Sequence, residues 1–163
     1  MLDMSKIECH ELLDRSLVGR LAMVSPDGRP YTIPMRYVWH DAAIYVRIAY
    51  DGRKQEALEF ARRVCFETDE VEDDFSHYAS VLVEGVLLDI HDDTEKRSAL
   101  VALNEKYSRL AGLANPGPNP VTRGVAIRRI TVESISGKKS EPTAPRPSVR
   151  HLELTPALRR VKR

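Results

Sequence analysis

The sequence predicts an α+β protein built on an antiparallel β-barrel with peripheral helices. Short segments alternate apolar with polar residues, and turn signals separate neighbouring segments. The dipeptide Asp27-Gly28 lies between two such segments, which is typical of a tight β-hairpin. No helix recurs between strands at the spacing of a parallel sheet. We therefore expect about six strands in a barrel joined mainly by hairpins.

Composition limits the class of protein before any motif is considered. A chain of 163 residues is enough for one domain that folds without a disulfide framework or a structural metal. The chain is 42% hydrophobic and 30% charged, values that exclude a disordered or collagen-like protein. It holds neither a long apolar run nor a signal-peptide pattern, and Cys9 and Cys65 have no metal-ligand spacing. We expect a cytoplasmic protein with no metal site.

The first half of the chain is expected to form a helix followed by a hairpin. The helix begins with Ser5 and Glu8, which have the spacing of a capping box. A strand at residues 20–25 and a returning strand at residues 31–39 flank the Asp-Gly turn. Pro34 lies inside the returning strand and has no N–H group to donate. That strand is therefore expected at a sheet edge, or interrupted at the proline.

The second half is expected to contain four more strands and two helices, at residues 43–49, 53–61, 64–67, 80–90, 93–110 and 125–135. Gly85 predicts a β-bulge in the strand at 80–90. Six acidic residues fall between Glu67 and Asp74. We interpret this stretch as an exposed, solvated loop rather than as a cation site.

Charge is distributed unevenly, and this asymmetry predicts a domain boundary. Residues 1–136 are acidic overall, whereas residues 137–163 carry eight Lys and Arg against two acids. The terminal segment also contains Pro142, Pro145, Pro147 and Pro156. We expect a folded domain at 1–136 and a basic, proline-rich tail at 137–163. Such a tail can contact nucleic acid or a protein partner, or can simply be solvated; it lacks the interleaved aromatic residues that stack on bases.

Residues 47–54 contain the pattern most suggestive of a ligand. Arg53 and Lys54 stand at the start of an expected helix, directly after a glycine-containing turn, and Arg47 stands at the end of the preceding strand. The free N–H groups and the dipole of a helix N-terminus favour anions. Two adjacent cations would strengthen binding of a phosphate monoester. The sequence has no dinucleotide-binding glycine motif, phosphate-binding loop, nucleophile elbow or zinc pattern.

Five collinear segments resemble the pyridoxamine 5′-phosphate oxidase-like, flavin-binding split-barrel family, especially the small bacterial branch that includes nitroimidazole-resistance proteins. The segments are residues 19–39, 43–58, 64–71, 80–85 and 130–139. The resemblance covers about residues 12–139 and implies a homodimer of split barrels that binds FMN at the subunit interface. The domain at 1–136 would then be the FMN-binding split barrel.

The resemblance also implies a set of cofactor contacts, and it identifies no catalytic residue. It places Thr32, Pro34, Met35 and Arg36 at the isoalloxazine ring, Arg47, Ile48 and Ala49 along the flavin and ribityl chain, Arg53 and Lys54 at the phosphate, and Ser80 at the flavin or phosphate. Relatives often have histidine where Arg47 stands. Arginine stays protonated and cannot act as a base, but a cation near the ring would favour anionic reduced flavin.

We therefore expect an FMN-binding protein, and specifically a flavin-dependent oxidoreductase or reductase that acts on an unidentified small molecule. The chain lacks the full set of substrate-phosphate contacts expected of a true pyridoxamine phosphate oxidase. Two alternatives remain open at this point. The same fold could bind the deazaflavin F420 or haem, or the protein could be a non-catalytic binding module whose basic tail contacts nucleic acid or a partner.

Overall fold

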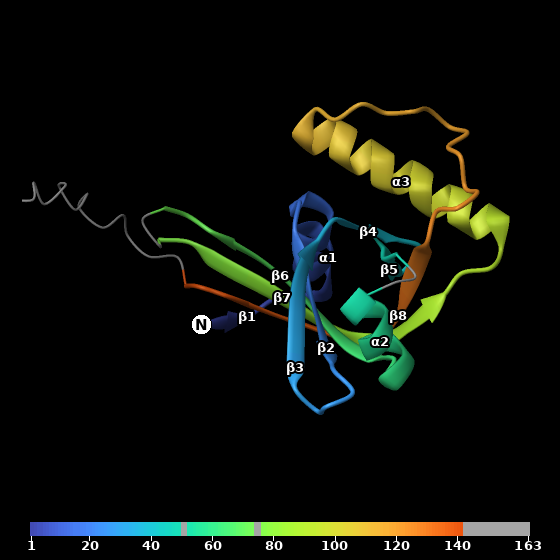
Figure 1. Cartoon of the computed structure of the whole chain (residues 1–163). Coiled ribbons are helices and arrows are strands. Elements are labelled where there is room, and N and C mark those ends of the chain that lie inside the picture. Colours follow the sequence, from blue (N-terminus) through green and yellow to red (C-terminus); the bar gives the residue numbers. More distant parts are fainter. Residues whose placement is uncertain (50–51, 74–75, 142–163) are drawn as a thin grey trace, which may run out of the picture.

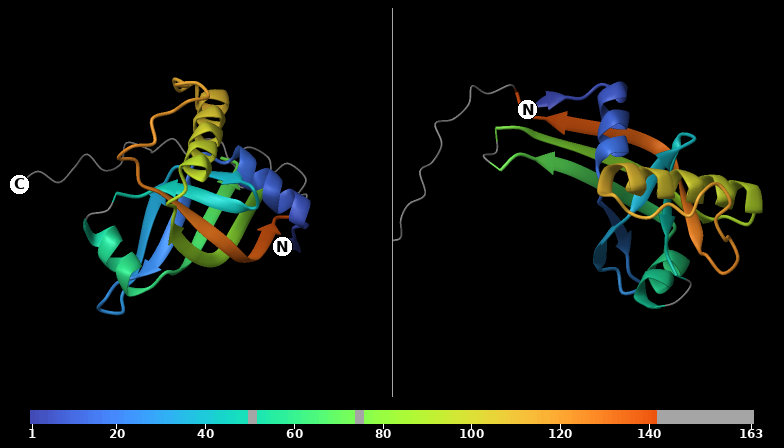
Figure 2. Two further views of the ribbon diagram at one scale, coloured as in Figure 1. Left: turned by 90° about the vertical axis from the view of Figure 1, so that its right-hand side faces the viewer. Right: turned by 90° about the horizontal axis from the view of Figure 1, so that it is seen from above.

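One curled antiparallel sheet forms the body of the protein, with three helices packed on different parts of it (Figures 1 and 2). The structure is a computed structural model in which residues 1–49, 52–73 and 76–141 are described. The predicted class, an α+β protein with an antiparallel half-barrel sheet, is confirmed. Along the sheet the strand order is β3-β2-β6-β7-β8-β5-β4, and β1 adds to β8.

The elements follow the chain in this order: β1 (Leu2–Asp3), α1 (Lys6–Arg15), β2 (Gly19–Val24), β3 (Pro30–Met35), β4 (Tyr37–His40), β5 (Ala43–Arg47), α2 (Gly52–Phe60), β6 (Arg63–Val71), β7 (Tyr78–Asp89), α3 (Asp93–Ala111) and β8 (Ile127–Lys139). Helix α1 packs on β7 and β8, α2 on β2, and α3 on β4. Among the described residues, no helix is both long and apolar enough to cross a membrane.

The returning strand expected at 31–39 is two strands rather than one. β3 lies at one edge of the sheet, as Pro34 predicts, and β4 lies at the other. The break falls at Arg36. At the start of β4 the N–H of Tyr37 donates to the hydroxyl of Tyr107 at 3.0 Å, which connects this edge strand to α3. The chain thereby carries the sheet around toward a barrel.

The prediction that the acid-rich stretch forms a loop is wrong as far as Val71, because β6 continues through it and pairs with β7. Arg20 of β2 donates to both Glu67 and Asp69, at 2.9 and 2.7 Å. Between these acids, Thr68 is fully buried and donates to a backbone carbonyl at 2.9 Å. These two carboxylates are therefore matched by one arginine on one face of a regular strand. The described residues contain no cluster of His, Cys, Asp or Glu able to hold a metal ion.

The last strand also extends beyond its expected end at residue 135. β8 continues to Lys139, which pairs with Leu2 of β1, a strand that the sequence did not predict. The amino group of Lys139 donates to the carboxylate of Glu8, so α1 is tied to the same strand. The expected boundary between residues 136 and 137 falls within β8. Most of the expected tail, residues 142–163, lies outside the described residues.

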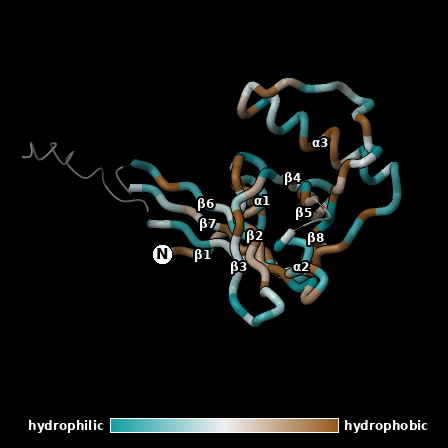
Figure 3. Tube along the Cα trace, in the orientation of Figure 1, coloured by the Kyte–Doolittle hydropathy of each residue, from teal (hydrophilic) through white to brown (hydrophobic). Residues whose placement is uncertain are grey.

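The core occupies the concave side of the sheet. Apolar and polar residues alternate along the strands (Figure 3), and the inward set packs beneath α1, where Leu12 and Leu13 are fully buried. The capping box of Ser5 and Glu8 is present. The predicted bulge at Gly85 is confirmed by a shift in the β7–β8 register between Glu84 and Gly85. A smaller apolar cluster lies between α3 and β4–β5.

Candidate functional site

An open cavity of about 640 Å³ lies beside the start of α2. It is lined by two segments, the end of β5 with the start of α2 and the chain just before β8: Arg47, Ile48, Ala49, Lys54, Gly124, Val125 and Ala126. The N–H of Ile48 donates to the carbonyl of Ala126 at 3.2 Å, which holds the two segments side by side. We call this cavity the α2 groove.

The start of α2 gives the α2 groove a positive end. Gly52 opens the helix with a φ of +71°, a conformation that glycine adopts without strain. The first turn of α2 contains no acidic side chain, whereas Lys54 stands in it and lines the groove. A cation at a helix N-terminus is unfavourable because of the helix dipole. An anion bound there would relieve that repulsion and accept hydrogen bonds from free N–H groups.

Arg53 takes a different direction from its neighbour. Its guanidinium lies 4.3 Å from the centre of the Tyr31 ring and 3.5 Å from the hydroxyl of Ser25, on the β2–β3 hairpin. It lines neither this groove nor the cavity described next. The two cations expected at one phosphate therefore flank the start of α2 from two sides.

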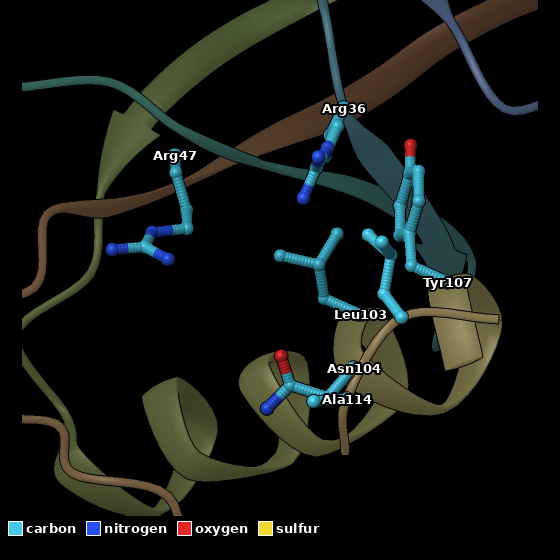
Figure 4. Close-up of a pocket in the computed structure, with 7 residues that line it drawn as sticks. Arg36, Arg47, Leu103, Asn104, Tyr107 and Ala114 are labelled. Atoms are coloured by element: carbon cyan, nitrogen blue, oxygen red, sulfur yellow. The ribbon is translucent and has the colours of Figure 1, made fainter. Parts of the chain in front are cut away.

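A narrower cavity of about 350 Å³ lies between the strands and α3 (Figure 4), and we call it the α3 cavity. Its lining is Arg36, Arg47, Leu103, Asn104, Tyr107, Leu113 and Ala114. Arg36 and Arg47 extend from the strands toward α3, from which Leu103 and Asn104 rise. Because Arg47 lines both spaces, the α3 cavity adjoins the α2 groove. Neither arginine forms an ion pair with an acid of the described residues.

Buried hydrogen bonds hold the α3 wall of this cavity in place. The hydroxyl of Tyr107 donates to the carbonyl of Leu17 and accepts from the N–H of Tyr37. The Tyr37 hydroxyl and the Lys106 amino group both donate to the carbonyl of Leu13, each at 2.8 Å. Burial raises the pKa of Tyr37 well above its usual range and lowers the pKa of Lys106 to about 8. These bonds connect α3 to the end of α1 and to β4.

The structure brings together half of the ten residues expected at the cofactor. The five that line the adjoining cavities are Arg36, Arg47, Ile48, Ala49 and Lys54. Thr32, Pro34 and Met35 lie on the edge strand β3, where Met35 packs against the core and the other two are exposed. Ser80 lies in β7 opposite Asp69 and Lys138. None of these four lines either cavity.

Sequence reasoning missed the contribution of α3. Leu103, Asn104 and Tyr107 line the α3 cavity, and the ring of Tyr107 lies 5.3 Å beneath the guanidinium of Arg36. The four-residue spacing of Leu103 and Tyr107 is also that of an ordinary core-facing helix. The sequence carried no signal that separates these two roles.

Comparison with protein-family models places the chain in a family. The model described as pyridoxamine 5′-phosphate oxidase matches residues 5–139, and the chain belongs to this pyridoxamine 5′-phosphate oxidase-like family. The resemblance expected from the sequence is thereby confirmed. Among curated proteins, none matches the chain.

Solved structures share the fold. A FAD-binding protein from Mesorhizobium loti is 27% identical with a TM-score of 0.67, over 86% of this chain and 98% of its own. A putative 5-nitroimidazole antibiotic resistance protein from Bacteroides thetaiotaomicron is 20% identical with a TM-score of 0.69, over 85% of this chain and 86% of its own. An F420 reductase is 23% identical with a TM-score of 0.56, over 77% of this chain and 94% of its own.

Proposed function

We propose that this protein binds FMN in the α2 groove and is a flavin-dependent oxidoreductase or reductase of a small molecule. The observation that carries the proposal is the convergence of Lys54, the start of α2 and Arg47 on one groove, which has an apolar side at Ala49 and Val125. Its volume lies within the roughly 300–1,000 Å³ typical of small-ligand sites. Family membership supports a flavin-type ligand.

The residues present fit a phosphorylated flavin. Lys54 and the free N–H groups of α2 would hold the phosphate, and Ala49 with Val125 would pack against the apolar part of the ligand. The bound flavin supplies the hydride chemistry, while the chain binds and orients it. A guanidinium group offers hydrogen-bond donors and no acceptor, so Arg47 would stabilise negative charge on the ligand rather than remove a proton.

The α3 cavity is our proposed place for the small-molecule substrate. It adjoins the α2 groove at Arg47, so a molecule in it would lie next to the cofactor. Arg36 stacks over Tyr107, and Asn104 adds an amide that can both donate and accept. These groups favour a substrate with an anionic or acceptor-rich group.

Haem fits the groove less well than a flavin. Haem iron takes an axial ligand such as His, Cys, Met or Tyr, and none of these residue types lines the α2 groove as described. F420 is also phosphorylated, so binding at Lys54 would suit it as well, and the test below separates the two. A contact of the basic tail with nucleic acid or a partner stays a prediction, because the tail lies largely outside the described residues.

We further propose that the protein works as a homodimer in the cytoplasm. The outer face of the sheet supports a second copy: Val24 of β2 and Leu82 of β7 are 41% and 39% exposed, beside a shallow cavity that includes Cys65. Both cysteines are free thiols, as is usual in a reducing compartment. Light scattering should give twice the chain mass, and Leu82→Lys should shift it toward the monomer. A monomeric wild-type protein would contradict the dimer.

The cofactor proposal is tested by the visible absorbance spectrum of the purified protein, before and after addition of FMN. The mass of any ligand released by heat identifies what was bound. We expect flavin bands or saturable FMN uptake near one per chain. A released deazaflavin or haem, or a protein that ignores FMN, would overturn the proposal.

A further inference from the structure

We propose that Arg128 is a positioning residue that holds the start of α2, and with it Lys54, against the α2 groove. Arg128 lies in β8, lines neither cavity and is therefore not expected to touch the cofactor. The inference rests on the proposed binding of the FMN phosphate at Lys54. It adds the residue that keeps Lys54 in place.

The contacts of Arg128 lead directly to the phosphate end of the groove. Its side chain is only 1% exposed, which is unusual for arginine. Its Nε donates to Oδ1 of Asp89 at 2.7 Å, and its Nη2 donates to Oε1 of Gln55. Gln55 follows Lys54 in the first turns of α2. The planar guanidinium fork thus joins β7 and β8 to the helix in a fixed direction.

The carboxylate of Asp89 also secures the other end of α2. Its Oδ2 accepts from Nη1 of Arg62 at 3.0 Å, and Arg62 follows the helix by two residues. Burial alone would raise the pKa of Asp89, but hydrogen bonds from Arg128 and Arg62 outweigh it and lower that pKa. The carboxylate is therefore ionised near neutral pH, and it binds cations that hold both ends of the helix.

Apolar packing alone holds α2 only weakly, so the polar contacts of Arg128 matter for its position. Within α2 only Ala57 and Leu58 are buried, so the helix has a small apolar contact with the body of the protein. Successive residues of a helix point about 100° apart. A fixed Gln55 side chain therefore sets the rotation of the helix and the direction in which Lys54 points.

The test compares FMN with riboflavin, which has the same ring and ribityl chain but no phosphate. Gln55→Met keeps the length of the side chain and removes the acceptor for Arg128. We expect the Kd for FMN to rise about tenfold, which corresponds to the loss of one charge-assisted hydrogen bond. The Kd for riboflavin should stay unchanged. Phe60→Met is the matched control, because Phe60 is an exposed residue of the same helix, and it should change neither constant.

Arg128→Lys is the second variant, since lysine keeps the charge but cannot reach Asp89 and Gln55 as a fork. It should show the same selective loss for FMN, with thermal unfolding recorded to show that each variant is folded. An equal loss for both ligands, or no loss in Gln55→Met, overturns the positioning role while leaving FMN binding by the wild type intact. A wild-type protein that binds no FMN overturns the proposed function and this inference together.

Discussion

Lys106 lies between the carbonyl of Leu13 and the face of the Tyr37 ring, 3.7 Å from the ring centre, with 4% of its surface exposed. Burial lowers its pKa from 10.5 to about 8, and the nearby Asp14 carboxylate only partly opposes this. The folded state therefore disfavours the protonated amine. Removing water from a charged group costs free energy that one carbonyl and an aromatic face offset incompletely.

The linked prediction concerns stability at alkaline pH. Because the folded pKa lies below the unfolded value, the unfolded chain binds more protons between about pH 8 and 10.5, and stability contributed through Lys106 rises with pH there. Lys106→Met should lack this rise. Urea unfolding at pH 7 and 9.5 should show the wild type gaining about 2 kcal/mol relative to the variant. Lys96→Met, on the same helix, should follow the wild type; equal pH dependence in Lys106→Met would contradict the account.

At the scale of the elements, α1 is held at its first turn by Glu8. The carboxylate accepts from the backbone N–H of Ser5 at 2.8 Å and from the amino group of Lys139 in β8. The hydrogen bond from Lys139, followed by that from Ser5, lowers the pKa of Glu8 to about 2. This one side chain caps a helix and links it to β8, one of the strands on which the helix packs.

Glu8→Gln tests that link, because glutamine keeps the capping-box geometry without the charge. A carboxyl group with a lowered folded pKa contributes stability that is present above its unfolded pKa and is lost as pH falls toward the folded value. The melting temperature of the wild type should exceed that of Glu8→Gln at pH 7. The gap should close as pH falls from about 4.5 to about 2. A gap that is independent of pH would show that the carboxylate charge is unimportant.

At the bulge, Gly85 lets β7 and β8 approach each other closely. A Cβ atom at Gly85 would lie 2.2 Å from the backbone carbonyl oxygen of Thr131. A backbone carbonyl in a paired strand cannot move aside cheaply, so Gly85→Ala should lose about 2 kcal/mol or more in urea unfolding. Ser136→Ala, at an exposed position of β8, should change stability by less than about 0.5 kcal/mol. Comparable values for the two variants would refute the close approach.

For the molecule as a whole, the features that could be predicted were the local ones. Alternating residues and the Asp-Gly turn identified the β2–β3 hairpin, and the capping box identified α1. The connection of β4 to α3 depends on the hydroxyl of Tyr107, which lies 70 residues from Tyr37 in the sequence. The length of β6 depends on Arg20, whose charge matches acids that in isolation suggest a solvated loop.

For the candidate site, too, the parts that are local in sequence could be predicted and the parts that depend on distant contacts could not. The end of β5 and the start of α2 are contiguous in sequence, so Arg47, Ile48, Ala49 and Lys54 could be identified together and do line one groove. The α3 wall and the anchor at Arg128 arise from contacts between elements far apart in the chain. Such contacts leave no pattern in a single sequence. These contacts form only when the folded sheet brings the distant elements together.

The central claim is that the α2 groove binds FMN through its phosphate, and a titration with FMN and riboflavin tests it most directly. The wild type should bind one FMN per chain and bind riboflavin at least about tenfold more weakly, because riboflavin lacks the charge-assisted contacts. Lys54→Met should remove most of that preference while leaving riboflavin binding unchanged. No saturable FMN binding by the wild type, or an undiminished preference in Lys54→Met, would contradict the account.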